Sequence, residues 1–149
     1  MAQWLQPQEL PSNEQAIQAE GYPAYRVHPE GPRDAYSSIV YLEPFSGRNL
    51  RAFGYDMHAE PTRRAAMDAA RDSGEIRLSG TVTLIQEDGK DVQKGILMYA
   101  PVYRGGQVPD HAAQRRALLW GWVHAPFRMN DPDARRARRP PPGPVDRPL

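Results

Sequence analysis

The sequence predicts an α+β domain in which about five antiparallel strands form a sheet and short helices cover one of its faces. Several short segments alternate apolar and polar residues, and turn residues bound them. One helical segment separates the second strand-like segment from the third, and the last three follow one another closely along the chain. This order predicts two strands, a helical crossover and an antiparallel meander.

The strands are predicted from alternation and from the turns between them. Residues 37–44 and 50–56 are expected to form a hairpin through the SGRN turn at 46–49. Residues 80–87 set Val82 and Leu84 against threonines and predict a half-buried strand. Asp88 and Gly89 then predict a turn, residues 95–103 a largely apolar central strand, and residues 116–127 an aromatic-rich final strand.

A helix is predicted between Pro61 and Gly74. Proline suits a first helical turn, where its missing N–H has no intrahelical partner, and glycine suits a left-handed C-terminal cap. Alanines at 65, 66, 69 and 70 are expected to pack closely on the sheet, and the charged residues Arg63, Arg64, Asp68 and Arg71 are expected to face mostly water. The same order of elements occurs in PAS-like sensor domains, which form a ligand pocket between sheet and helices, but the order alone leaves other α+β sheets open.

The two ends differ in composition from the middle. Residues 1–20 are polar with scattered prolines, and residues 131–149 are almost entirely Pro, Arg, Asp and Ala. Such a tail cannot bury apolar area and is expected to be disordered or polyproline-like, so we place the folded unit at about 15–130. The tail arginines could contact phosphates, but without an aromatic platform for bases we interpret them as a solvated run.

Composition excludes several classes of site and partner. A net charge of +1 over 149 residues gives no overall field that would attract a nucleic acid or an anionic membrane. Without cysteine there is no disulfide, thiolate metal site or cysteine nucleophile. The chain opens with no basic region followed by an apolar run, and no stretch approaches the ~18 apolar residues that a membrane span needs.

No pattern of catalytic or metal-binding residues stands out. Histidines 28, 58, 111 and 124 lack the HxH, HxxxH and HExxH spacings of metal sites. His58 and Asp56 could imitate a dyad, but no nucleophile stands in a recognisable motif, and the glycines form no phosphate-binding pattern. We therefore expect no enzyme activity, no cofactor and no metal.

An ordered set of motifs resembles the CHASE domain, the extracellular sensory module of transmembrane histidine kinases and nucleotide cyclases. The resemblance runs from about Gly21 to Asp131 and is specific only as a combination. Its members are Glu43-Pro44, Asn49, Gly54-Tyr55-Asp56, Pro61, Arg63, Gly74, Pro101-Val102-Tyr103 and Pro126-Phe127-Arg128.

The resemblance implies a domain that binds a small ligand outside the cytoplasmic membrane and signals through flanking transmembrane helices to a kinase or cyclase. The implied location is periplasmic or extracellular, and the implied full-length receptor is a homodimer. Family members begin with a long membrane-connected helix and continue toward a second transmembrane helix. This chain shows neither pattern, so we expect a fragment with residues 1–20 as a truncated N-terminal segment and residues 21–130 as the sensory domain.

The resemblance also indicates ligand-binding residues. In the plant cytokinin receptors, which the family includes, an aspartate matching Asp56 accepts hydrogen bonds from an adenine-type ring, and Leu78 matches an apolar wall position. Gln86 and Glu87 stand where the plant proteins have a threonine, which argues against a cytokinin itself. Further residues that could line the pocket are Tyr55, Met98, Tyr99 and Tyr103.

Several alternatives remain open at this stage. Asp56 could instead stabilise the start of a helix, and Leu78 and the tyrosines could belong to the core. Arg63 and Arg64 could bind a carboxylate ligand or form a solvated face. The expected ligand is adenine-like, a peptide or an organic acid; the alternative function is a protein-interaction or dimerisation module that uses the aromatic stretch 118–127.

Overall fold

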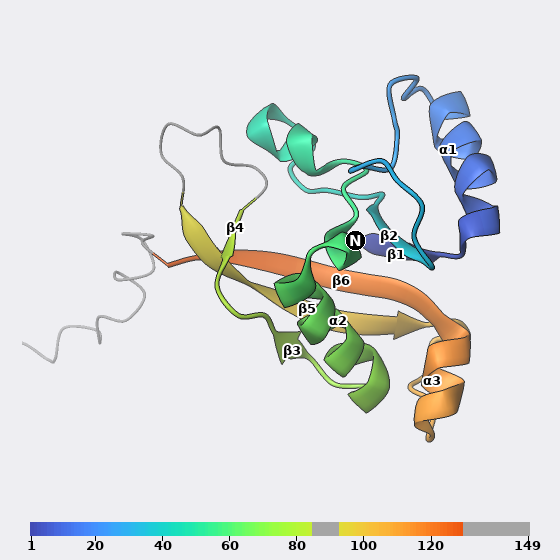
Figure 1. Ribbon diagram of the computed structural model, residues 1–149, viewed down its shortest axis with the longest axis vertical. Coiled ribbons are helices and arrows are strands. Elements are labelled where there is room, and N and C mark those ends of the chain that lie inside the picture. The colour runs from blue at the N-terminus through green and yellow to red at the C-terminus, as the bar shows by residue number, and fades with distance from the viewer. Residues whose placement is uncertain (85–92, 130–149) are drawn as a thin grey trace, which may run out of the picture.

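The structure, a computed structural model, describes residues 1–84 and 93–129 and consists of a curled antiparallel sheet with a few short helices (Figure 1). The strands are β1 (Ala2–Leu5), β2 (Tyr36–Ile39), β3 (Arg77–Leu78), β4 (Val82–Thr83), β5 (Lys94–Tyr103) and β6 (Leu119–Arg128). The sheet order is β2-β1-β6-β5-β3, and β4 pairs with β5 beside β3. The predicted α+β, PAS-like class is confirmed.

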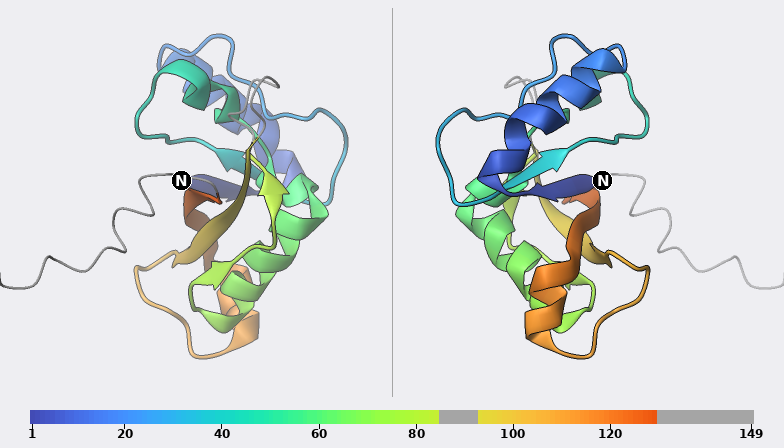
Figure 2. Two further views of the ribbon diagram at one scale, coloured as in Figure 1. Left: turned by 90° about the vertical axis from the view of Figure 1, so that its left-hand side faces the viewer. Right: turned by 90° about the vertical axis from the view of Figure 1, so that its right-hand side faces the viewer.

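Three α-helices and three short 3-10 helices complete the described fold. The α-helices are α1 (Leu10–Ala19), α2 (Pro61–Ser73) and α3 (Ala112–Leu118), and the 3-10 helices are η1 (Pro7–Glu9), η2 (Gly47–Ala52) and η3 (Met57–Ala59). Figure 2 shows α2 close to the sheet and α1 at the β1–β2 end of the molecule. Leu10 and Ile17 of α1 pack with a second apolar cluster that contains Leu5 and Tyr36.

The main core lies between α2 and the long pair β5–β6. Met67 and Trp122 are fully buried in it. The indole Nε1 of Trp122 donates a hydrogen bond of 3.1 Å to the backbone carbonyl of Met67. Burying large apolar side chains stabilises the contact, and the indole hydrogen bond fixes where along α2 the strand packs.

The predicted helix is confirmed at both ends, whereas its orientation is partly wrong. Glu60 caps α2 by accepting from the Thr62 and Arg63 amides, and Gly74 has φ +72° in the left-handed region. The buried side of α2 contains Ala66 and Ala70, but the alanines at 65 and 69 are exposed. Arg63, which was expected to face water, is only 4% exposed because it lies on the same side as Ala66, Met67 and Ala70.

The expectation that the folded unit begins near residue 15 is wrong. Strand β1 lies inside the sheet, between β2 and β6, and Ala2 is fully buried. This close approach depends on Gly121, where a Cβ would lie 2.0 Å from the carbonyl oxygen of Ala2. The pairing joins residues more than a hundred positions apart, so a local reading of a polar N-terminus does not detect it.

The predicted hairpin of residues 37–44 and 50–56 is also wrong. Strand β2 ends at Ile39, and residues 47–52, which include most of the SGRN turn, form the helix η2. Tyr55 and Asp56 make only isolated bridges, to His28 and Ser38. At Gly54 the chain passes so close to Arg26 that a Cβ would lie 2.2 Å from the Arg26 carbonyl oxygen, which interrupts any regular strand.

The later strands agree better with the sequence. Strand β5 corresponds to the predicted strand 95–103 and β6 to 116–127, although residues 116–118 belong to α3. Of the described residues of the predicted strand 80–87, which are 80–84, Val82 and Thr83 form β4. The Asp88-Gly89 turn, Gln86, Glu87 and the tail 131–149 lie outside the described residues.

Replacing Gly121 with alanine tests the buried position of β1. We expect Gly121→Ala to lower the free energy of unfolding by at least about 2 kcal/mol, because the new methyl group must push β1 away from β6. Val123→Ala on the same strand is the control, since Val123 is 42% exposed. Chemical denaturation that gives equal losses for the two variants would contradict the position of β1.

Candidate functional site

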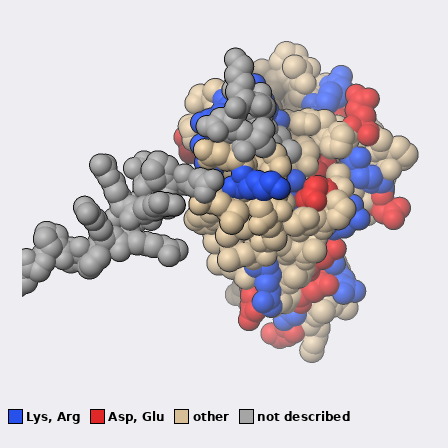
Figure 3. Space-filling view, turned by 60° about the vertical axis from the view of Figure 1, so that its left-hand side comes forward, with Lys and Arg blue, Asp and Glu red and all other residues tan. Residues whose placement is uncertain are grey.

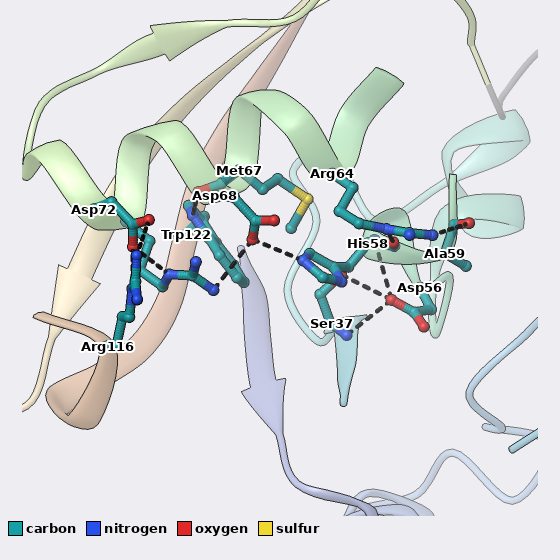
Figure 4. A network of polar contacts seen from close by, with 11 residues as sticks. Ser37, Asp56, His58, Ala59, Arg64, Met67, Asp68, Asp72, Arg116 and Trp122 are labelled. Carbon is teal, nitrogen blue, oxygen red and sulfur yellow. Dashed lines mark hydrogen bonds and ion pairs between the residues drawn. The ribbon is translucent and has the colours of Figure 1, made fainter. Parts of the chain in front are cut away.

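Asp56 is a fully buried carboxylate held by donors from several segments of the chain (Figure 4). Its Oδ1 accepts from the backbone amide of Ser37 at 2.8 Å, from the Ser37 hydroxyl at 3.0 Å and from the His58 amide at 3.1 Å. Its Oδ2 accepts from Nε of Arg33 at 2.9 Å. Both oxygens are thus occupied by groups of the chain itself.

These contacts give Asp56 a structural role that the sequence allowed as an alternative. The carboxylate caps η3 through His58, while α2 has its own cap in Glu60. It also ties the segment that carries Arg33 to β2 and η3. A buried carboxylate needs this set of donors because leaving it unpaired costs several kcal/mol.

Polar contacts continue along the exposed side of α2 (Figure 4). His58 Nε2 lies 2.9 Å from an oxygen of Asp68. Farther along the helix, Arg116 of α3 donates two hydrogen bonds to Asp72, and together with Arg71 it lowers the pKa of that carboxyl below its ordinary value. These contacts hold η3 against the middle of α2 and α3 against its C-terminal end.

A small chamber lies between η3, α2 and the strands β5 and β6. Its volume is about 20 Å³, and its walls are Ile39, Ala52, Tyr55, Met57, Arg63, Leu84, Leu97 and His124. Tyr99, the fully buried neighbour of Leu97 two positions along β5, donates from its hydroxyl to the Met57 sulfur at 3.6 Å. The chamber is therefore mostly apolar with a few polar groups, the composition typical of a small-molecule site.

Arg63 supplies the positive charge of the chamber. Its Nη2 donates to the Thr83 carbonyl at 2.7 Å and its Nη1 to Glu60 at 3.3 Å. The guanidinium carbon lies 5.6 Å from the centre of the Tyr55 ring, a cation–π distance. Its buried Nε has no hydrogen-bond partner within residues 1–84 and 93–129.

Burial also shifts the titration of two other groups here. It lowers the pKa of His124 to about 3, with a smaller contribution from the nearby Met1 ammonium group, so the imidazole is neutral at physiological pH. The buried Nδ1 of His124 has no hydrogen-bond partner in the described part of the chain. Burial raises the pKa of the Tyr99 hydroxyl, which remains protonated. Perturbed titrating groups around one cavity are typical of functional sites.

The residues suggested by the resemblance are only partly brought together. Tyr55 lines the chamber and Tyr99 lies next to it, with Asp56 adjacent in the chain. Leu78 pairs with Met98, one position away from Tyr99 on β5, so both side chains point to the other face of the sheet. Leu78 is 59% exposed there, neither in the core nor at the chamber.

Of the remaining suggested residues, Tyr103 is not among the residues that line the chamber. Tyr103 donates a hydrogen bond from its hydroxyl to the backbone carbonyl of Arg71. Glu87 lies outside the described residues.

His124 was not predicted to line a pocket, and Arg63 was expected mainly at the surface. Arg63 stands three and four positions before Ala66 and Met67, which is the spacing of one helix face, so its burial was detectable in principle. His124 alternates with Trp122 along β6, and this period of two places both on the core side of the sheet.

A larger hollow lies elsewhere, between α1 and the segment 40–45. This groove has a volume of about 560 Å³, and its lining includes Ile17, Tyr22, Tyr41, Phe45 and Phe53. Its aromatic side chains are partly exposed, whereas the chamber is lined mainly by buried side chains. We take the chamber as the candidate site because two of its lining residues, Arg63 and His124, carry buried polar atoms without a hydrogen-bond partner in residues 1–84 and 93–129, and a ligand could satisfy them.

Other kinds of site find no support in the part of the chain that the structure describes. These residues contain no group of three or more potential ligands that could hold a metal ion, and none of their helices combines the length and apolarity of a membrane span. On the face shown in Figure 3, basic and acidic side chains of the described residues are interspersed and form no continuous area of one sign. That face therefore has no field that would attract a polyanion.

Removing the Asp56 carboxylate tests its structural role. We expect Asp56→Ala to lower the free energy of unfolding by about 3–5 kcal/mol, because Arg33 then loses its acidic partner and the buried Ser37 amide loses its acceptor. Asp34→Ala, at an exposed carboxylate close by, should change it by less than about 0.5 kcal/mol. Equal effects of the two substitutions in urea denaturation would refute the role.

The neutral state of His124 predicts a pH dependence of stability. Its pKa is lower in the folded protein than the ordinary value of 6.5, so its contribution is complete above pH 6.5 and is lost as the pH falls toward 3. Between pH 7 and 5 the wild type should lose about 2 kcal/mol relative to His124→Gln. His111→Gln, at an exposed histidine, should follow the wild type, and a His124→Gln curve parallel to the wild type would contradict the buried, neutral state.

Comparison with known proteins agrees with this architecture. The family model of the CHASE domain matches residues 1–137 of the chain. The match includes the N-terminal strand β1 as well as the segment that carries the chamber. No curated protein matches the chain. The family match covers most of the sequence, and the chain therefore belongs to the CHASE domain family, which comprises extracellular sensory domains of receptors rather than catalytic domains.

Proposed function

We propose that this chain is the ligand-binding part of a transmembrane receptor and that its ligand occupies the chamber between α2 and β5–β6. The output of the receptor would be a histidine kinase or a nucleotide cyclase, with the sensory part outside the cytoplasmic membrane. The family supports the sensory role. The observation that carries the choice of site is that two residues lining one cavity, Arg63 and His124, each hold a buried polar atom without a hydrogen-bond partner among the described residues.

Ligand entry requires the chamber to enlarge. Its volume of about 20 Å³ is enough for one water molecule, well below the 300–1,000 Å³ typical of ligand pockets. Met57 is the wall residue best able to yield, because an unbranched methionine changes shape at low cost. Met57 lies in η3, directly before α2, so a ligand that moves this side chain also acts on the start of α2.

Movement of α2 would reach other parts of the sheet through the contacts already described. Asp72 joins the far end of the helix to Arg116 of α3, and α3 leads directly into β6. Met67 is bonded to Trp122 in the middle of β6. A ligand that binds one arrangement of α2 more tightly than another would therefore shift the position of β6, which is the requirement for a sensor.

The contacts that Asp56 already makes bear on which class of ligand can bind. An adenine-like ligand would have to compete with Arg33, Ser37 and His58 for the carboxylate. An organic acid or a peptide carboxylate would instead approach the positive charge of Arg63. The structure thus favours the acidic candidates over an adenine-like ring.

A second candidate function, dimerisation, is favoured by an exposed apolar area. Trp122 and Leu119 of the aromatic stretch are buried in the core, so they are not available to a partner. Val123 and Phe127 of β6 are 42% and 49% exposed, and Leu78 is exposed on β3. We expect a homodimer of the full-length receptor to use this area, and Phe127→Lys should then lower the dimer fraction in sedimentation experiments while Phe45→Lys, at an exposed site on the groove, should not.

A thermal-shift screen tests the proposed site. Adenine derivatives, amino acids, organic acids and short peptides would be screened against the wild type, and every hit against two cavity-filling variants. Leu97→Phe fills the chamber and Ala16→Trp fills the groove at α1. The chamber site predicts hits whose stabilisation, RT ln(1 + [L]/Kd), is lost in Leu97→Phe and kept in Ala16→Trp. The opposite pattern would assign the ligand to the groove.

A further inference from the structure

We propose that the ligand of the chamber is a small carboxylate of about two to four carbons, bound through its carboxyl group by the guanidinium of Arg63. The proposal rests on the chamber being the ligand site. It deepens that function by narrowing the acidic candidates to a small monocarboxylate and by naming the guanidinium hydrogens that bind it.

The guanidinium of Arg63 is a buried positive charge that is only partly compensated. Arg63 is 4% exposed, and a guanidinium cannot lose its proton in a protein, so α2 carries a permanent positive charge into the interior. Its acidic contact is Glu60, at 3.3 Å, and the same Glu60 carboxylate accepts from the amides of Thr62 and Arg63. Because that carboxylate also serves as the helix cap, it compensates the charge only in part.

Asp56, the other buried charged residue in the described part of the chain, differs from Arg63 in its contacts. Asp56 has both oxygens occupied, including an ion pair with Arg33 at 2.9 Å. Arg63 has an Nε–H with no acceptor among the described residues. An unsatisfied donor on a charged group is costly, and an anionic ligand would remove that cost.

The guanidinium of Arg63 matches a carboxylate in shape. The Nε–H and a hydrogen of Nη2 form one side of the guanidinium fork, which matches the two oxygens of a carboxylate. The bond to the Thr83 carbonyl uses one of the two Nη2 hydrogens. The ring of Tyr55, 5.6 Å from the guanidinium carbon, and the Thr83 contact together fix the plane of the group. The fork is therefore positioned before a ligand arrives.

The other walls of the chamber constrain the rest of the ligand. The remaining walls of the chamber are mainly aliphatic and include Ile39, Leu84 and Leu97. They suit a short hydrocarbon body. Nδ1 of the neutral His124 is a second polar point, which can hydrogen-bond a keto or hydroxyl substituent. A chamber of about 20 Å³ can expand for such a molecule with a change of the Met57 rotamer, whereas a purine requires a much larger rearrangement.

The experiment follows the Arg63 Nε–H signal in ¹H–¹⁵N spectra of the full chain. Sodium propionate and the uncharged, equally sized propionamide would be titrated at constant ionic strength, with sodium chloride as the balancing salt. The Nε–H signal is assigned by its loss in Arg63→Lys. We expect propionate to shift this signal and also the Leu97 and Met57 methyl signals, which are followed in ¹H–¹³C spectra. We expect propionamide to leave the Nε–H signal unchanged.

Matched variants separate the bound group from general charge. Arg63→Met should weaken propionate binding at least about tenfold, since it removes hydrogen bonds to a charged group. The affinity of Arg63→Lys for propionate should lie between those of the wild type and Arg63→Met, because lysine keeps the charge but lacks the guanidinium fork. Arg64→Met, at the exposed next residue, should bind propionate as the wild type does. If Arg63→Met fails to fold, the wild-type Nε–H titration still decides the outcome.

The possible results distinguish this inference from the function on which it rests. If propionamide shifts the Nε–H signal as strongly as propionate, or if Arg63→Met binds propionate normally, the carboxylate proposal is wrong. If a compound from the screen shifts the Leu97 and Met57 methyl signals but not Arg63 Nε–H, the chamber remains the ligand site and the carboxylate proposal fails. If neither propionate nor any screened compound shifts the methyl signals, both proposals fail.

Discussion

The burial of one guanidinium, that of Arg63, constrains much of the structure around the chamber. A cation inside a protein is costly unless its surroundings supply acceptors. Here the acceptors come from the helix cap Glu60 and from the Thr83 carbonyl of β4, and the face of Tyr55 adds a cation–π contact. The start of α2, strand β4 and the segment before η3 are thereby held in fixed positions relative to one another. The polar wall of the chamber is a consequence of how this charge is accommodated.

The two buried charged side chains of the described residues, Asp56 and Arg63, serve different purposes. Asp56 is saturated with donors and organises the fold, because Arg33, Ser37 and His58 reach it from separate segments. Arg63 is compensated only in part and faces a cavity. Fully satisfied polar groups rigidify a structure, whereas an incompletely satisfied one favours a ligand that completes its contacts. This difference is why we place ligand recognition at Arg63 and structural organisation at Asp56.

Local signals explain which parts of the fold were predictable from the sequence. Pro61 and Gly74 delimit α2 because each has a backbone reason to stand at a helix end, and the apolar run of β5 is long enough to specify a buried strand. Strand β1 was missed because its partners are remote in sequence. The strand expected at 50–56 was wrong because six alternating residues do not outweigh the close crossing at Gly54. Of the candidate site, Tyr55 and Tyr99 were anticipated through the family resemblance. The position of Leu78 on the opposite face follows from its register with Met98, which composition and spacing do not reveal.

The proposed signal runs from the buried charge on α2 to β6 through the contacts of Met67 with Trp122 and of Asp72 with Arg116. The proposed ligand site lies on the α2 side of the sheet and not in the wider groove beside α1. The most direct measurement is a crystal structure of the chain with a stabilising compound from the screen. We predict ligand density between Arg63, Leu97 and His124, with Met57 displaced toward the start of α2. Density in the groove beside α1, with the side chains around Arg63 unchanged, would contradict the account.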